Sequence, residues 1–433
     1  MKRFLALSVV CAAAVLTSSR AWAWNAIGHL ASAKLAYDEL DDGQRAELFA
    51  LLHKHSHFIQ YLAAARPPEV GEMEWAVLRA AVWPDWVRPR HNGSGGPDPR
   101  GPGITKYSRS EEHYVDVPLI DPKDTVFFAG KTLIPPDGTD IICALRQRCN
   151  DLRTKNAAAE DKAVAICWIF HLVGDIHQPL HNAEYFSSEE GFQHGDQGGN
   201  RFGVKINGRK WKLHAFWDDL LGEDAAYWDD SPEHQRHIFR DAMKVAHHLQ
   251  GLQLSDADKE KLAKNLSFAS WSQEGFELAK TIAYQKTDGS GILDHVEIRP
   301  GQPIPESAPE AGARYAEIAR ATAEVRIVLA GKRLAERIKR LLGSTAPSAT
   351  FGMSFTTNRT CSSGRSQPAL VRLTSCSQSR HADCSSGMED VFVAEVCLAP
   401  AACKKRLTPL LSIVRRCPPG DPYNFISDRR RLP

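Results

Sequence analysis

The segment DKAVAICWIFHLVGDIHQPLH, residues 161–181, joins an apolar helical pattern to a dense group of potential metal ligands. Pro179 should end the helix, because proline has no backbone N–H to donate. His171 and Asp175 are four residues apart, so one ion can reach both from one helical face. His181, beyond the break, can turn toward a second site. A lone buried histidine would be a core residue, but a carboxylate in this apolar setting is costly without a cation. The segment therefore predicts a buried metal-binding helix.

The chain around this segment, from Trp24 to about Leu342, is expected to be all-α apart from a small hairpin. Hydrophobic periodicity predicts helices over residues 26–40 and 311–342, with Asp41 or Asp42 capping a following helix. Residues 200–208 read as a β-hairpin. Stretches rich in glycine and proline, over 91–103 and 286–310, are expected to be loops.

The two ends of the chain differ from its middle. Residues 1–23 have a basic start, a short apolar run and an Ala-Trp-Ala ending, which is typical of a signal peptide. Cleavage there would leave Trp24 as the N-terminus of a secreted or periplasmic product with no membrane anchor. The net charge is +2 overall, +3 for residues 1–23 and +6 for residues 343–433, which leaves −7 for residues 24–342. A broad basic binding surface is therefore excluded for the middle of the chain.

Nine cysteines remain after the expected cleavage. Cys143 and Cys149 flank a short basic stretch and are the expected local disulfide, whereas Cys167, in an apolar helical run, is expected to be a buried thiol. The other six lie in the tail, residues 343–433, which is rich in Ser, Arg, Cys and Pro. Two interpretations of this tail stay open: a small disulfide-stapled module, or the product of a misread 3′ end of the gene.

Four further motifs carry residues suited to binding metal or phosphate. In one of them the spacing of four residues seen in the first segment recurs. A free α-amine at Trp24, together with its own carbonyl, can also chelate zinc, with a histidine close by in the sequence. The residues are His214 and Asp218 in KLHAFWDD, Asp85 and Arg88 in AVWPDWVRPR, His113, Tyr114 and Asp116 in EEHYVDVP, and His29 in WNAIGH.

Taken together and in order, these motifs resemble the nuclease S1/P1 family of secreted zinc-dependent single-strand nucleases and 3′-nucleotidases. The resemblance covers residues 24–342, and the tail has no recognised counterpart. It implies a mainly helical phospholipase C/P1 nuclease-like fold with a trinuclear zinc cleft. The matching elements are WNAIGH at 24–29, WPDWVR at 83–88, HYVD at 113–116, HLVGDIHQPLH at 171–181, GDQGGN at 195–200 and LHAFWD at 213–218.

The resemblance implies three zinc ions per chain, with nine ligand residues. Asp175 would be shared between the first two ions. The implied sets are Asp85, His113, His171 and Asp175 for the first ion, the amine and carbonyl of Trp24 with His29 and Asp175 for the second, and His181, His214 and Asp218 for the third.

The resemblance also implies a reaction and its substrates. A hydroxide shared by two zinc ions would attack phosphorus in line, with Asp85 and Asp175 holding the metals and Arg88 neutralising charge on the phosphoryl oxygens. Tyr114 would stack on an unpaired base, and Asp116 with Asn200 would complete a base pocket. We therefore expect a monomeric enzyme that acts on single-stranded DNA and RNA and on 3′-nucleotides and leaves 5′-phosphates.

The same residues also allow other interpretations. A zinc phospholipase C would share the fold and metals, but the related phospholipases use Glu where Asp218 stands. A non-catalytic secreted zinc-binding protein would need a closed structural site, which is often rich in cysteine. At single positions, Arg88 could be a surface ion-pair partner and Tyr114 a core aromatic.

Overall fold

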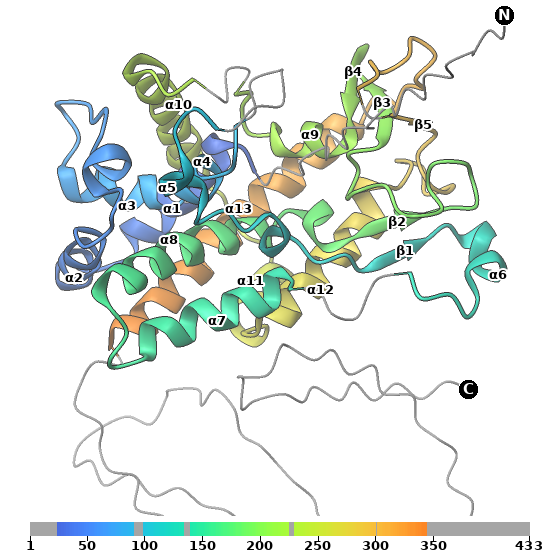
Figure 1. Ribbon diagram of the computed structural model, residues 1–433. Helices are drawn as coiled ribbons and strands as arrows, with labels where there is room; N and C mark the ends of the chain where they lie inside the picture. Colours follow the sequence, from blue (N-terminus) through green and yellow to red (C-terminus); the bar gives the residue numbers. More distant parts are fainter. Residues whose placement is uncertain (1–23, 91–97, 134–138, 225–228, 300, 344–433) are drawn as a thin grey trace, which may run out of the picture. The chain divides into compact units, whose positions relative to one another are not determined.

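The computed structural model describes residues 24–90, 98–133, 139–224, 229–299 and 301–343. The predicted signal peptide and all but the first residue of the predicted tail lie outside this part of the chain. Within it, the prediction of a mainly helical fold is confirmed (Figure 1). The helices are α1 Ala26–Asp38, α2 Asp42–Leu52, α3 Glu72–Ala80, α4 Trp83–Trp86, α5 Pro102–Thr105, α6 Thr125–Phe128, α7 Ile141–Arg153, α8 Ala159–Asp175, α9 Leu213–Asp218, α10 Pro232–Gln250, α11 Asp256–Lys264, α12 Phe268–Leu278 and α13 Tyr315–Gly343.

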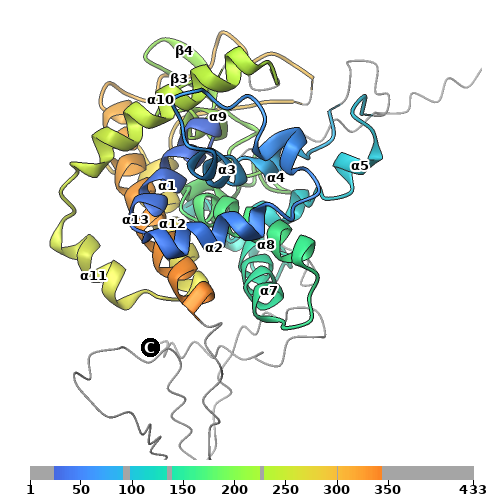
Figure 2. The same cartoon turned by 90° about the vertical axis from the view of Figure 1, so that its left-hand side faces the viewer.

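Helix α8 is the central element of the helical body. From Ile166 to Asp175 every side chain is buried, and α1, α2, α3, α4, α7 and α13 all pack against it. Figure 2 shows α1, α2 and α13 grouped close to α8. The helix ends at Asp175, and Pro179 begins the separate 3-10 turn Pro179–Asn182, as the proline predicted.

Helices α1 and α2, both packed against α8, begin with side-chain caps. Asn25 accepts hydrogen bonds from the backbone N–H groups of Ile27 and Gly28 at the start of α1. Asp41 caps α2 and forms a reciprocal capping box with Gln44. These caps satisfy N–H groups that have no partner inside the helix.

The β-structure of the described residues is small and consists of two sheets. Strands β1 and β2 are parallel and pair Pro118 with Glu184, while β3 lies between β4 and β5 in an antiparallel sheet. The predicted hairpin exists, but it lies further along the chain, with its turn at Asn207–Gly208. Both turn residues have positive φ (52° and 75°), as a tight two-residue turn requires. The strands are β1 Pro118–Ile120, β2 Glu184–Phe186, β3 Phe202–Ile206, β4 Arg209–Lys212 and β5 Val296–Glu297.

The predicted Cys143–Cys149 disulfide is wrong. Both residues lie in the continuous helix α7, where six residues span roughly 9 Å along the axis and the side chains point in different directions. A disulfide requires Cα atoms within about 7 Å. Cys149 is a buried thiol, and so is Cys167, as predicted.

At Gly331 the last helix, α13, packs against α1. A Cβ atom at this position would lie 2.6 Å from the Cβ of Leu35 and 3.1 Å from the carbonyl oxygen of Ser32. Glycine is disfavoured inside helices, by about 1 kcal/mol relative to alanine. Its presence here is explained by the close approach of the two helices.

We expect Gly331→Ala to lower the free energy of unfolding by about 1–2 kcal/mol, because the overpacking cost exceeds the gain in helix propensity. Urea unfolding followed by far-UV circular dichroism measures this change. Gly43→Ala is the matched control, since Gly43 is exposed in α2 and a Cβ there would approach only the Asp41 carboxylate, at 3.3 Å. The control should be neutral or stabilising. Equal effects at both positions would contradict the packing argument.

Candidate metal centre

The Asp175 carboxylate, at the C-terminal end of α8, joins histidines from three parts of the chain. Its Oδ1 lies 3.2 Å from Nε2 of His29 in α1. Its Oδ2 lies 2.9 Å from Nδ1 of His113 and 3.2 Å from Nε2 of His171. One carboxylate therefore presents each oxygen to a different set of nitrogens, which is the geometry needed to share it between two ions.

Asp85, from the short helix α4, closes the other side of this arrangement. Its Oδ1 lies 3.6 Å from Nε2 of His171 and 2.9 Å from Nε of Arg88. Arg88 is 3% exposed, so this ion pair is internal and Arg88 is not a surface residue. Burial alone would raise the pKa of Asp85, but Arg88 and the nearby histidines hold the pKa below its usual range.

Two compact groups result, which we call the paired groups because both contain His171. One is His29, Asp85 and His171, and the other is His113, His171 and Asp175; in each, the donor atoms lie within 4.8 Å of one another. Asp85 and His113, which the resemblance assigns to one ion, fall in different groups, and His171 belongs to both. All of these side chains are buried.

His181, His214 and Asp218 form a third group. Nε2 of His214 lies 3.4 Å from Oδ2 of Asp218, and the ring centres of His181 and His214 are 5.0 Å apart. Gln178 donates from Nε2 to Oδ1 of Asp218 at 2.8 Å, which leaves Oδ2 directed toward the histidine. The break at Pro179 places His181 in this group, apart from His171 and Asp175.

Backbone carbonyls fix the orientation of three imidazoles. The Nδ1 atoms of His171, His181 and His214 lie 2.6–2.7 Å from the carbonyl oxygens of Ala81, His113 and Gly198. Since Nδ1–H donates to the carbonyl, the lone pair on Nε2 is available to a metal ion. Histidine ligands of metals are commonly held in this way.

The donor set fits zinc, which takes imidazole nitrogen and carboxylate oxygen at short range. Nδ1 of His29 is buried and makes no hydrogen bond within the described part of the chain, while Oδ1 of Asp175 and Oδ2 of Asp218 are buried against imidazole nitrogens at 3.2 and 3.4 Å. Burial, with repulsion from nearby carboxylates, raises the pKa of Asp218 well above its usual range. A bound cation would satisfy these atoms and stabilise the charged carboxylate.

Trp24 lies between the paired groups and the third group. It is fully buried, and its indole Nε1 donates to the carbonyl oxygen of Gly174 at 3.1 Å, next to Asp175. The backbone N–H of Asn25 donates to the carbonyl oxygen of Asp218 at 3.3 Å. The indole of Trp24 and the peptide group that follows Trp24 thus contact the C-terminal ends of α8 and α9, the helices that carry Asp175 and Asp218.

The predicted base-pocket residues lie on segments attached to the third group. Tyr114 and Asp116 follow His113, and the N–H of Val115 donates to the carbonyl oxygen of His181. Asn200 lies in the loop whose Gly198 carbonyl accepts from His214, and its Nδ2 donates to the carbonyl oxygen of Gln197 at 2.9 Å. Tyr114 is half-buried, so it is not a fully enclosed core aromatic.

Sequence comparison agrees with this geometry, because the family model described as S1/P1 Nuclease matches residues 24–343. The chain belongs to the S1/P1 nuclease family. Among the described residues, no helix is both long and apolar enough to span a membrane.

Named relatives in this family match shorter stretches. The chain is 37% identical over 82 residues to Endonuclease 3 and 43% identical over 61 residues to Endonuclease 4, both from Arabidopsis thaliana. It is 36% identical over 62 residues to Nuclease S1 from Aspergillus oryzae. These matches cover 14–18% of this chain, and the chain spans a quarter or less of each relative's length.

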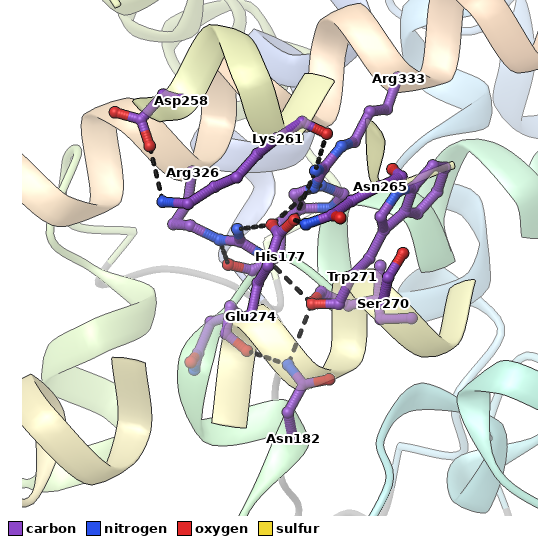
Figure 3. A network of polar contacts seen from close by, with 12 residues as sticks. His177, Asn182, Asp258, Lys261, Asn265, Ser270, Trp271, Glu274, Arg326 and Arg333 are labelled. Carbon is purple, nitrogen blue, oxygen red and sulfur yellow. Dashed lines mark hydrogen bonds and ion pairs between the residues drawn. The ribbon is translucent and has the colours of Figure 1, made fainter. Parts of the chain in front are cut away.

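The sequence did not reveal the residues that hold the turn 176–178, which connects Asp175 to the third group. Asn182 donates from Nδ2 to the carbonyl oxygens of Ile176 (3.0 Å) and Gln178 (2.9 Å). Arg326 of α13 donates from Nε to the carbonyl oxygen of His177 at 3.0 Å (Figure 3). All three carbonyls of the turn therefore have side-chain donors.

Arg326 is itself anchored by Glu274 of α12 in a buried network (Figure 3). Its Nη1 lies 2.6 Å from Oε2 of Glu274, and Arg333 contacts both carboxylate oxygens of Glu274. Nη1 of Arg333 also lies 2.9 Å from Nε2 of His177. Arginines on the buried face of a long helix were the available sequence signal, but their partners are distant in the chain.

We expect Asn182→Ala to destabilise the protein by about 2–3 kcal/mol, because it removes two donors from buried carbonyls. The turn between the metal groups would loosen, so zinc should also be lost at a lower chelator concentration. Urea unfolding and residual zinc after dialysis against chelator measure the two effects. Asn150→Ala, at an exposed position in α7, is the control. Undiminished zinc retention in Asn182→Ala would contradict the proposed link between the turn and the metal groups.

Proposed function

We propose that this protein is a secreted zinc-dependent endonuclease of single-stranded DNA and RNA that also cleaves 3′-nucleotides and leaves 5′-phosphate products. The observation that carries the proposal is the shared Asp175 carboxylate, one oxygen facing His29 and the other facing His113 and His171. The third group begins only a few residues further on, beyond the turn at Pro179. This arrangement suits a reaction in which an attacking and a leaving oxygen both need stabilisation.

The fit of the donor atoms supports three zinc ions per chain. His113, His171, Asp175 and Asp85 would hold one, and His29, Asp175 and the freed amine and carbonyl of Trp24 a second. His181, His214 and Asp218 would hold the third. When bound, the zinc ions supply water of lowered pKa and positive charge for the phosphate oxygens.

Arg88 and Asp85 have complementary tasks in this proposal. Asp85 carries negative charge at a buried position, and the adjacent guanidinium of Arg88 balances it. A guanidinium has five N–H donors, which is more than one carboxylate oxygen accepts. Further donors of Arg88 would bind phosphoryl oxygens and stabilise the charge that they carry in the transition state.

Selection of unpaired strands follows from the proposed base pocket. Tyr114 would stack on a base, a contact worth about 1–3 kcal/mol for any base. Asp116 and Asn200 would bind the edge of the base. A base inside a duplex is already stacked and paired, so it enters the pocket only after unpairing. Duplex DNA should therefore be a poor substrate.

The free N-terminus gives the sharpest test of this function. We propose that residues 1–23 are removed on secretion and that the domain of residues 24–342 acts as a monomer. Protein beginning at Trp24 should hydrolyse denatured DNA and bind three zinc ions. A methionine before Trp24 removes the α-amine ligand, so it should lower activity by at least tenfold and zinc content by about one ion.

The assay compares denatured DNA, duplex DNA and phosphatidylcholine, with zinc measured by elemental analysis. Equal activity and zinc content with and without the extra methionine would exclude the Trp24 amine as a ligand. Hydrolysis of phosphatidylcholine in preference to denatured DNA would instead indicate a phospholipase and refute the proposed substrates.

A second prediction concerns Tyr114. Tyr114→Ala should raise KM for single-stranded DNA by tenfold or more, because it removes a stacking surface, while zinc content stays unchanged. Tyr114→Phe keeps the ring and serves as the matched control, so its KM should remain near that of the unaltered protein. Parallel loss of zinc and of substrate binding in Tyr114→Ala would show a structural role instead.

A further inference from the structure

Glu184, the first residue of β2, is a buried acid that the proposed reaction leaves without a role. Its side chain is 8% exposed. Its Oε1 accepts a hydrogen bond from the backbone N–H of Gln197 at 2.9 Å, and its carboxyl group shares a hydrogen bond with Asp116. One side chain thus joins two segments that are far apart in the sequence.

The same two segments carry the proposed base-binding groups. Asp116 lies on the strand-like segment that leads into β1, next to β2. On the other side, the carbonyl oxygen of Gln197 accepts from Nδ2 of Asn200. Glu184 therefore contacts Asp116 directly and supports Asn200 through Gln197.

The loop that carries Asn200 is closely fitted around Glu184. Gly195 has φ +88°, and a Cβ on it would collide with the Glu184 carboxyl group. Asp196 holds the loop to the core, accepting from the N–H of Tyr185 at 3.0 Å and from the hydroxyl of Tyr284 at 2.8 Å. The position of Gln197 relative to Glu184 is thus fixed from both sides.

The charges around Glu184 favour its neutral form. Asp116, Asp196, Tyr114 and Tyr284 are the titratable groups that interact with it. Burial raises the pKa of Glu184 well above its usual range, and repulsion from Asp196 and Asp116 adds to this effect. A hydrogen bond between two carboxyl groups needs one proton, and burial with the neighbouring charges favours that proton on Glu184, so Glu184 donates to Asp116, which keeps its acceptors for other groups.

We propose that Glu184 is a positioning residue for base recognition: its carboxyl group hydrogen-bonds Asp116 and accepts from the backbone N–H of Gln197, and so aligns Asp116 and Asn200 with the edge of the base. This inference rests on the proposed nuclease function. It adds a preference for bases with an exocyclic amino group, because Asp116 offers only acceptors. At the ring position where cytosine has its amino group uracil has a carbonyl oxygen, and the N3–H donor of uracil lies one position away, so the two bases distinguish an Asp116 that faces this exocyclic group, at equal ring size.

Two substitutions separate the contacts of Glu184 from its charge. Glu184→Gln keeps an acceptor for Gln197 and a donor for Asp116 without a titrating proton. Glu184→Leu has a similar volume and loses both contacts. Glu190→Gln is the control. The Glu190 side chain is 93% exposed and lies on the loop between β2 and β3 that also carries Asn200, so its KM values should match those of the unaltered protein.

The experiment measures kcat and KM for 3′-CMP and 3′-UMP between pH 6 and 9, with zinc content. We expect Glu184→Leu to raise KM for 3′-CMP about tenfold, to the value for 3′-UMP, with a much smaller change in kcat and full zinc. In the unaltered protein KM for 3′-CMP should rise as the pH passes the raised pKa of Glu184, because a second carboxylate then repels Asp116. Glu184→Gln should keep the preference for 3′-CMP and lose this rise.

Several results would overturn the inference. The first is an unaltered protein with equal KM for 3′-CMP and 3′-UMP. The second is a Glu184→Leu protein that keeps the lower KM for 3′-CMP. The third is a Glu184→Gln protein whose KM for 3′-CMP depends on pH as in the unaltered protein. If Glu184→Leu does not fold, the pH profile of Glu184→Gln decides alone. An unaltered, zinc-loaded protein that cleaves neither nucleotides nor single-stranded DNA would refute the proposed function itself. Cleavage without the expected effects at Glu184 would refute this inference alone.

Discussion

The structure depends on one buried negative charge, the Asp175 carboxylate at the end of α8. A fully buried carboxylate is too costly to keep in an apolar interior unless cationic or hydrogen-bonding groups compensate it. Here the compensation comes from His29, His113 and His171, which arrive from three separate parts of the chain. The packing of α1 and of the segment around His113 against α8 is therefore coupled to the site, and the metal groups are part of the core.

A second set of polar residues holds the turn that follows Asp175. The turn 176–178 must leave α8 at a fixed angle so that His181 reaches the third group. Asn182 and Arg326 hold its carbonyls, and Glu274 neutralises Arg326. This buried network connects α12 and α13 to the site (Figure 3). The long terminal helix thus positions ligands that lie about 150 residues earlier in the chain.

The sequence predicted the features that rest on local spacing. The four-residue spacing of His171 and Asp175, the break at Pro179 and the helical class all follow from short-range rules, and the structure contains them. The hairpin lies later than predicted, because the Asn207–Gly208 turn sets its register. The Cys143–Cys149 disulfide does not form, because two cysteines six residues apart in a helix are close in sequence but not in space. Roles that depend on distant partners, such as those of Glu184 and Arg326, have no signal in a single sequence.

The charge of the chain bears on how a nucleic acid could be held. Residues 24–342 carry a net charge of −7, so the chain as a whole does not attract the many phosphates of a nucleic acid. Three zinc ions would add +6 at one location and leave the rest of the surface acidic. With positive charge only at the zinc ions, the phosphate at the cleavage site is attracted strongly and the adjacent phosphates of the strand are attracted weakly. Affinity must then come from the nucleotide at the cut, which is why a base pocket beside the metal groups, and the buried acid that aligns it, matter for the choice of substrate.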